Sequence, residues 1–131
     1  MKIRLDHVSA SESGDYYQVL FQAEEDGDGA YVLIQRQFEH PDGGLCYIEA
    51  HDEDYIGHFK VVRASLARNR FCLELRRRQA TEVEVTFKTT DQNYIDVARV
   101  MRIMIPYLEV VDAQDACQQG AGAGRPLRGR R

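Results

Sequence analysis

A chain of 131 residues in which 44% are hydrophobic and 29% are charged has the length and composition of a single folded domain, which excludes a disordered chain. No uncharged apolar run approaches the roughly 18 residues that a membrane helix needs, and the N-terminus has no apolar signal segment, so we expect a cytoplasmic protein. The net charge of −4 combines an acidic first part, residues 1–58 with 13 acids against 3 Lys or Arg, with a basic remainder; this disfavours non-specific nucleic-acid binding by the first part.

The first half of the chain has the two-residue period of β-strands. We expect a first strand at residues 2–8 and a second at residues 15–23, where apolar side chains alternate with polar ones. The strand at residues 30–38 is apolar on both sides at its centre, which is typical of a strand covered on both faces. Residues 24–29, EEDGDG, form a turn because glycine tolerates positive φ, and they lack the ligand pattern of an EF-hand calcium loop. A further strand follows at residues 45–50.

Two later segments alternate in the same way. Residues 70–76 and 82–88 each place apolar side chains on one face, which predicts a β-hairpin. Three consecutive arginines, residues 76–78, occupy its connection. We expect them on a solvated face near Glu82 and Glu84, because opposite charges on neighbouring strands attract.

One segment changes to a helical period. From Asp91 to about Ile105, apolar residues recur at intervals of three and four, which predicts an amphipathic helix. Thr89 and Gln92 fit a capping box at its start. Pro106 should end the helix, because proline lacks a backbone donor and restricts the residue before it.

Strands followed by one helix indicate the α+β class. We expect an antiparallel sheet of about five to seven strands with one C-terminal amphipathic helix packed on one face. Residues 1–112 form the single domain, and the Gly/Ala/Arg-rich residues 113–131 form a disordered tail. The three cysteines include no CxxC pair and support neither a zinc knuckle nor a disulfide framework, so we expect Cys46 and Cys72 to pack in the core.

The segment CYIEAHDEDYIGH, residues 46–58, concentrates side chains that bind metals or act in catalysis. If its first five residues form a strand, Cys46 points away from Glu49 and His51, which excludes a Cys–His pair. Glu49, His51 and His58 leave open a small metal- or ligand-binding, enzyme-like domain. The chain has no HExxH, GxSxG, P-loop or GxGxxG motif, so we assign no catalytic or metal-binding residue and expect no cofactor.

The same segment suits protein binding better than catalysis. Clustered carboxylates steer basic partners, and tyrosine offers a large contact area. We therefore expect a partner-binding surface made by the strand end and an exposed acidic loop, comprising Glu49, Asp52, Glu53, Asp54, Tyr55 and His58. A nucleic-acid-binding module that uses the arginine-rich hairpin and the basic tail is a second alternative, which the missing glycine–aromatic pattern of RNA-binding strands disfavours. The oligomeric state stays open.

The order of these features is similar to that of a known family. The strand YVLIQRQ, a turn, YIE, an acidic loop, Gly57, the segment VVRASLARNRFCLEL, the strand EVEVTF and a helix resemble the Imm10 family of bacterial immunity proteins, which belong to polymorphic toxin systems. The resemblance runs from about Ala30 to Ile105 and matches the family pattern at Tyr47, Glu49 and Gly57. The arginine-rich hairpin, the basic tail and the absence of Trp depart from it.

That resemblance implies a function without catalysis. Such a protein binds a cognate toxin domain and occludes its active site. A cytoplasmic inhibitor implies a toxin that acts inside the cell, and an acidic first half suits a basic toxin. The identity of the toxin stays open.

Overall fold

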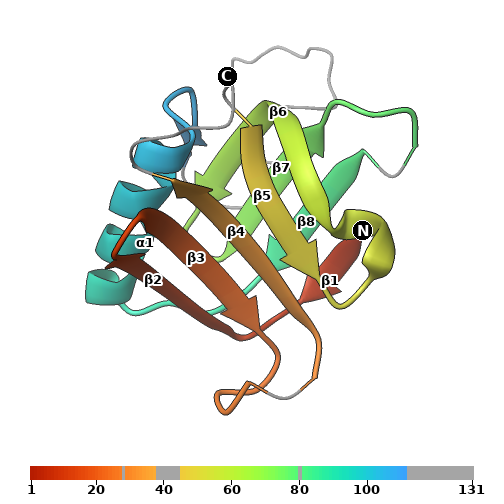
Figure 1. Cartoon of the computed structure of the whole chain (residues 1–131). Coiled ribbons are helices and arrows are strands. Elements are labelled where there is room, and N and C mark those ends of the chain that lie inside the picture. Colours follow the sequence, from red (N-terminus) through yellow and green to blue (C-terminus); the bar gives the residue numbers. More distant parts are fainter. Residues whose placement is uncertain (28, 38–44, 80, 112–131) are drawn as a thin grey trace, which may run out of the picture.

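A computed structural model of the chain describes residues 1–27, 29–37, 45–79 and 81–111 (Figure 1). The predicted tail at residues 113–131 and the end of the domain before it lie outside these residues. The elements, in chain order, are β1 (Lys2–Arg4), β2 (His7–Ser13), β3 (Tyr16–Gln22), β4 (Tyr31–Gln37), β5 (Leu45–Ala50), the 3-10 turn η1 (Glu53–Tyr55), β6 (Gly57–Ala67), β7 (Arg70–Leu75), β8 (Glu82–Thr86), α1 (Asp91–Met104) and β9 (Glu109–Val110).

The strands form one curved sheet in the order β1-β8-β7-β6-β5-β4-β3-β2, with β9 beside β6. Together with α1, this sheet confirms the predicted α+β class. The expectation of roughly five to seven antiparallel strands is wrong in two respects. The described residues give the sheet nine strands, and it is mixed, because β1 pairs with β8 and β9 pairs with β6 in parallel.

The strands that were not predicted lack a regular two-residue period in their sequences. The single strand expected at residues 2–8 is divided, because β1 ends at Arg4 and β2 begins at His7. The rest of β2 was not predicted, since this strand lies at the end of the sheet and its mostly polar sequence, HVSASES, lacks a continuous apolar stripe. The strand β6 does carry apolar residues, but its register shifts between Val61 and Arg63, and such an irregularity breaks the two-residue period. The strand β9 has two residues, too few for any period to show.

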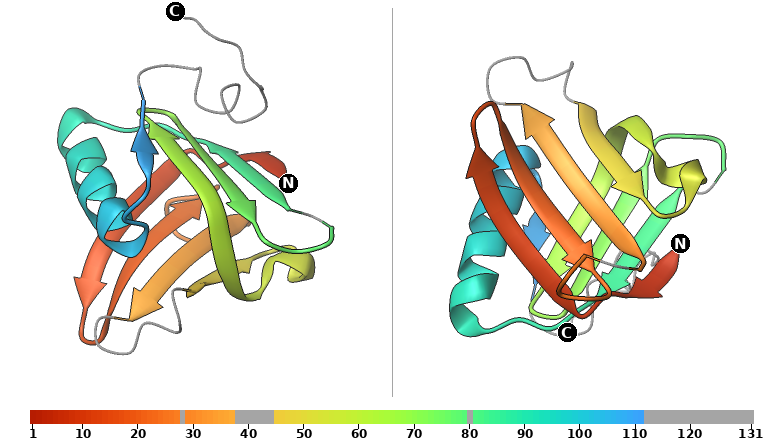
Figure 2. Two further views of the ribbon diagram at one scale, coloured as in Figure 1. Left: turned by 90° about the horizontal axis from the view of Figure 1, so that it is seen from above. Right: turned by 60° about the horizontal axis from the view of Figure 1, so that its bottom comes forward.

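The curved sheet folds over into two layers, with β2–β5 in one and β6–β8 with β1 in the other (Figure 2). Phe21 of β3 reaches across the interior. Its ring centroid lies 5.7 Å from that of Phe71 in β7 and 5.1 Å from that of Phe87, which follows β8. Neither residue belongs to a strand beside β3, so these contacts join the two layers through the core. The inward faces predicted for β3, β7 and β8 are confirmed, since their alternate residues are buried: Val19, Phe21, Phe71, Leu73, Leu75, Val83 and Val85.

The helix α1 lies along the side that the curved sheet leaves open, against β2 and β3 (Figure 2). Its predicted extent is confirmed, but the cap is Thr90 and not Thr89, because Thr90 Oγ1 accepts a hydrogen bond from Asn93 N at 3.2 Å. At the other end, Arg36 of β4 donates to the carbonyl of Met104 at 2.6 Å, which satisfies a helix-end acceptor. The buried helix side chains are Val97, Ala98, Val100, Met101 and Met104.

The two described cysteines differ in their surroundings. Cys46 is 1% exposed and packs in the core as predicted, and this burial raises the pKa of its thiol. Cys72 lies on the other face of its strand and is half-buried, so the expectation that it packs in the core is wrong for this residue.

Truncating Phe21 should destabilise the fold strongly. The variant Phe21→Ala removes both aromatic contacts between the layers and leaves a cavity, which should lower the free energy of unfolding by about 3–5 kcal/mol. Chemical denaturation measures this change. The control Ile95→Ala, at a helix position that is 57% exposed, should change it by less than about 0.5 kcal/mol. Similar losses in both variants would contradict the role given to Phe21.

Candidate binding surface

The side chains of β5 point alternately into the core and toward the candidate site. Cys46, Ile48 and Ala50 are buried, while Tyr47 and Glu49 point to the solvent side of the sheet. This is the arrangement that the sequence predicted, and it keeps the thiol of Cys46 away from the carboxylate of Glu49. The outward side chains of β3 and β4 lie on the same side, because β3, β4 and β5 are hydrogen-bonded neighbours.

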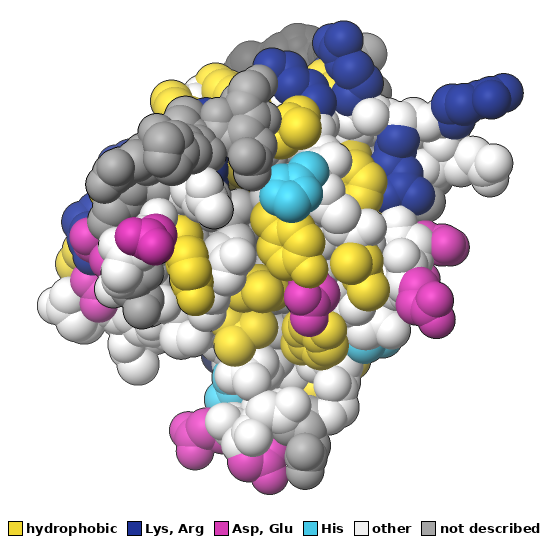
Figure 3. All heavy atoms as spheres, viewed as in Figure 1, with side chains coloured by type: hydrophobic (Ala, Val, Ile, Leu, Met, Phe, Trp, Pro, Cys, Tyr) yellow, Lys and Arg dark blue, Asp and Glu magenta, His cyan; other side chains and the backbone are white. Residues whose placement is uncertain are grey.

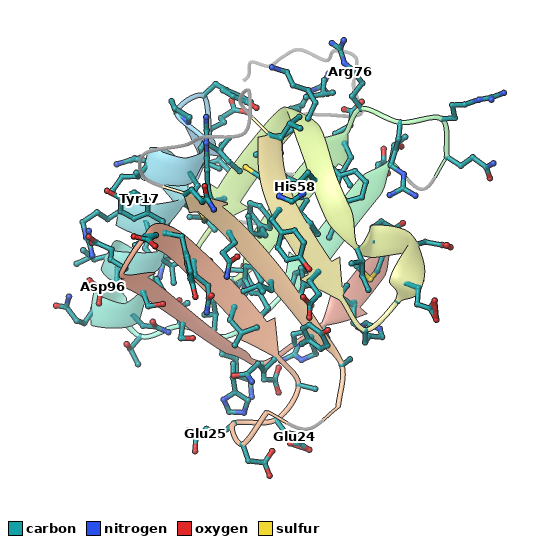
Figure 4. All side chains as sticks on the ribbon, in the orientation of Figure 1. Tyr17, Glu24, Glu25, His58, Arg76 and Asp96 are labelled. Carbon is teal, nitrogen blue, oxygen red and sulfur yellow. The ribbon has the colours of Figure 1, made fainter. Side chains whose placement is uncertain are left out.

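Glu49 is held by two tyrosines. The hydroxyl of Tyr31 donates to Glu49 Oε2 at 2.7 Å, and the hydroxyl of Tyr47 donates to Oε1 at 2.7 Å. The register explains both contacts: Tyr47 precedes Glu49 by two residues on β5, and Leu33 of β4, two residues after Tyr31, is paired with Glu49. On the other side, Tyr47 is paired with His58 of β6, and their ring centroids are 5.2 Å apart. We call Tyr31, Tyr47, Glu49 and His58 the tyrosine–glutamate cluster (Figure 4 labels His58).

The hydrogen bonds of the cluster shift the pKa values of its members. The hydroxyl groups of Tyr31 and Tyr47 lower the pKa of Glu49, because they stabilise the ionised carboxylate. The same bonds to Glu49 raise the pKa of both tyrosines, because the neutral hydroxyl is the donor. At neutral pH the carboxylate of Glu49 is therefore ionised and lies between two neutral tyrosine hydroxyl donors.

Apolar side chains surround the cluster. Leu20 of β3, Leu33 of β4 and Leu45 of β5 point outward and are half-buried. We call the solvent side of β3–β5, with these leucines and the cluster, the outer face. Figure 3 shows hydrophobic side chains gathered over it. The expectation that β4 is covered on both faces is wrong for the described residues, since no other strand or helix among them lies on the outer face. A solvated sheet side that is apolar at its centre is typical of an interaction site.

The predicted acidic loop is present after β5. Asp52, Glu53 and Asp54 are exposed, and the carboxylate of Asp52 caps the 3-10 turn by accepting from Asp54 N at 3.0 Å. Tyr55, which we expected to be exposed in this loop, is 5% exposed and belongs to the core, so its assignment to the binding surface is wrong. The turn points its ring inward, where the guanidinium of Arg77 lies 5.5 Å from the ring centroid.

A second acidic turn, between β3 and β4, also lies beside this surface, and its place there was not predicted from the sequence. Glu24, Glu25 and Asp26 are exposed there, and Figure 4 shows Glu24 and Glu25 at the lower end of the outer face. The loop after β5 reaches the same end, because His51 N donates to the carbonyl of Tyr31 at 3.3 Å. Both acidic turns therefore border the end of the outer face that carries Tyr31.

The metal-binding alternative finds no support in the described geometry. Glu49 and His58 share the cluster, but the ring of His51 contacts the backbone of Tyr31, with Nδ1 3.2 Å from the carbonyl oxygen. Within residues 1–27, 29–37, 45–79 and 81–111, no three His, Cys, Asp or Glu side chains are grouped as a metal site requires.

The three arginines of the hairpin connection, residues 76–78, form no ion pair with Glu82 or Glu84 among the described residues, so the expected pairing is wrong. Arg77 donates to the carbonyl of Asp54 at 2.7 Å and lies over Tyr55 and Phe59. Glu84 instead accepts the ion pairs of Lys2, at 3.8 Å, and Arg70, at 3.7 Å.

A basic hollow of about 540 Å³ lies at the other end of the hairpin, lined by Arg4, Arg68, Arg70 and Lys88. Each of these cations pairs with a carboxylate: Arg4 and Lys88 with Asp6, Arg68 with Asp91, and Arg70 with Glu84. These pairs offset the positive charge that a nucleic acid would need.

Comparisons of the chain with family models, with curated proteins and with solved structures found no match. In the part of the chain that the structure describes, no helix combines the length and the apolar character needed to cross a membrane.

Removing both donors to Glu49 should raise the pKa of its carboxyl. The double variant Tyr31→Phe, Tyr47→Phe keeps the rings but deletes the hydroxyls that lower this pKa. NMR titration of the Glu49 side-chain carboxyl measures it. The control Tyr16→Phe, on β3 opposite Gln37, should leave the Glu49 pKa unchanged. An unaltered pKa in the double variant would show that the two hydrogen bonds are absent in solution.

The same shift predicts a pH dependence of stability. Because the folded-state pKa of Glu49 is depressed, its ionised form stabilises the fold above its unfolded pKa, and this contribution is lost as the pH falls through the folded pKa. Denaturation at several pH values should therefore show a smaller loss on acidification in the double variant than in the parent protein.

Proposed function

We propose that this protein is an immunity protein that binds a cognate toxin domain and occludes its active site, without catalysis of its own. The observation that carries the proposal is the outer face, an apolar and tyrosine-bearing surface on a rigid sheet. Tyrosine side chains give large contact areas at low entropic cost, and a sheet holds them in fixed positions. Such a surface suits stoichiometric binding better than turnover.

The resemblance to the Imm10 family supports the same proposal. Of the three positions that match the family pattern, Tyr47 and Glu49 are hydrogen-bonded to each other at 2.7 Å on the outer face. Gly57 has a φ of 148° at the start of β6, a backbone conformation that other residues rarely adopt. We infer that the first two positions serve binding and that Gly57 serves the geometry of β6.

The charge around the outer face indicates the kind of toxin. The two acidic turns, Glu24–Asp26 and Asp52–Asp54, create a negative field at one end of this surface. Such a field steers basic proteins and raises their association rate. We infer that the toxin domain is basic and acts inside the cell, so that the inhibitor is needed in the cytoplasm.

Co-expression tests this function directly. If a toxin domain is encoded by the gene immediately upstream, this protein should restore growth to bacteria that produce that domain. The purified pair should form a stoichiometric complex in which the toxin is inactive. An immunity protein directed against another toxin is the control and should not protect. A neighbouring gene that encodes no toxin, or growth arrest that persists at an excess of this protein, would contradict the proposal.

Reversing the charge of the loop after β5 should slow association with the toxin. In the variant Asp52→Asn, Glu53→Lys, Asp54→Lys, asparagine keeps the cap of the turn, and the field changes sign. We expect the association rate to fall about tenfold at low salt and the difference to shrink at high salt. Stopped-flow mixing measures both.

The control for this variant changes the net charge by the same amount elsewhere. The substitutions Asp15→Lys, Gln92→Lys and Glu109→Lys lie in the β2–β3 turn, on α1 and on β9. If the control slows association as much as the loop variant, the effect reflects net charge and not the loop.

A further inference from the structure

Glu49 is ionised, and it forms no ion pair with a Lys or Arg in the described part of the chain. Carboxylates elsewhere, such as Asp6 and Asp91, each form an ion pair with an arginine, whereas Glu49 accepts only the two tyrosine hydroxyl groups. The hydroxyl groups of Tyr31 and Tyr47 are neutral donors, so they fix the carboxylate without cancelling its charge. A charge kept in half-buried, apolar surroundings gains from a partner of opposite sign.

The geometry of the carboxylate favours arginine as that partner. Each oxygen of Glu49 accepts one tyrosine hydroxyl, and an ionised carboxylate has about two acceptor positions on each oxygen. One position therefore remains on Oε1 and one on Oε2. A guanidinium presents two parallel N–H donors with the spacing of two carboxylate oxygens, and its plane also stacks on aromatic rings such as those of Tyr31 and Tyr47.

The field around the outer face adds charge complementarity. The exposed carboxylates of Glu24, Glu25 and Asp26 and those after β5 border the Tyr31 end of this surface. The partner segment that covers Glu49 must therefore be basic around its arginine. Leu20 and Leu33 lie next to the cluster, so the partner segment should also carry apolar side chains that contact these two leucines.

We propose that Glu49 is the docking point for an arginine on a basic surface segment of the toxin, with Tyr31 and Tyr47 positioning its carboxylate. This proposal rests on the immunity function proposed above and names the chemistry of the partner. The orientation of Glu49 is set before binding by the two tyrosines, which reduces the entropy lost on association.

The variant Glu49→Gln tests the docking point. It keeps the size of the side chain and removes the charge, so its affinity for the toxin domain should fall about 30-fold or more, mainly through faster dissociation. The matched control Glu109→Gln, on β9, should bind within about twofold of the parent protein. Calorimetry and surface plasmon resonance measure both. Equal binding by the two variants would overturn the proposal while leaving the immunity function standing.

A second variant guards against loss of folding in Glu49→Gln. Leu33 is paired with Glu49 across β4 and β5. In Leu33→Lys the new ammonium group lies beside the carboxylate and competes with the arginine of the toxin, while both tyrosine hydrogen bonds remain. We expect a similar loss of affinity, and unchanged affinity in a folded Leu33→Lys protein would also overturn the proposal.

A small probe separates failure of the docking point from failure of the immunity function. Titration with the peptide Gly-Arg-Gly, capped at both ends, should shift the NMR signal of the Glu49 carboxyl more than Gly-Lys-Gly does. If the toxin does not bind but the arginine peptide does, the immunity function is overturned and the arginine site stands with another partner. If neither binds, both proposals are overturned.

A second copy of this chain is the competing occupant of the outer face, because the chain carries exposed arginines such as Arg76 and Arg78. Sedimentation of the protein alone should show a monomer in both the parent and Glu49→Gln. A dimer that dissociates in Glu49→Gln would assign the outer face to self-association and overturn the toxin as its occupant.

Discussion

The contact of Phe21 with Phe71 and Phe87 holds the two layers of the sheet together, and the position of every candidate binding residue depends on it. These rings meet from opposite layers of one curved sheet, with centroids 5.7 Å and 5.1 Å apart, and they join the layers through the core. Close packing of this kind fills the space between the layers with apolar side chains, which form the hydrophobic core. The residues with chemistry to offer a partner therefore lie on the outside of the sheet, and the proposed function is one of surface recognition.

The six residues of β5 alternate between the core and the outer surface of the sheet. Inward residues such as Ile48 belong to the core, and outward residues such as Glu49 belong to the tyrosine–glutamate cluster. The strand β6 connects the two layers of the sheet. It pairs with β5 through residues 57–60 and with β7 through residues 61–67, and the register shift lies near the change of partner. The outer face is thus positioned by the same strands that enclose the core.

The sequence predicted the elements whose period is regular and long. Regular alternation predicted both the strand type and the buried faces of β3, β5, β7 and β8. The intervals of three and four residues did the same for α1. The strand β6 was missed because its irregularity breaks the alternation, and β2 was missed because an edge strand needs no apolar stripe.

The candidate site was predictable only in part, for a related reason. Alternation placed Glu49 and Tyr47 outward, but the hydrogen bond from Tyr31 depends on the register between β4 and β5, which one sequence does not specify. Tyr55 was misplaced because the direction of a side chain in a short 3-10 turn follows from how the turn docks, and no periodicity encodes it.

The alternation of β5 also has an evolutionary consequence. Because core and contact residues occupy separate positions on one strand, a substitution at an outward position removes no side chain from the core. Selection for a new partner can then act on Tyr47 or Leu33 while the residues that specify the fold are held by packing alone. In a scaffold with this arrangement, the core and the contact surface can therefore be substituted separately.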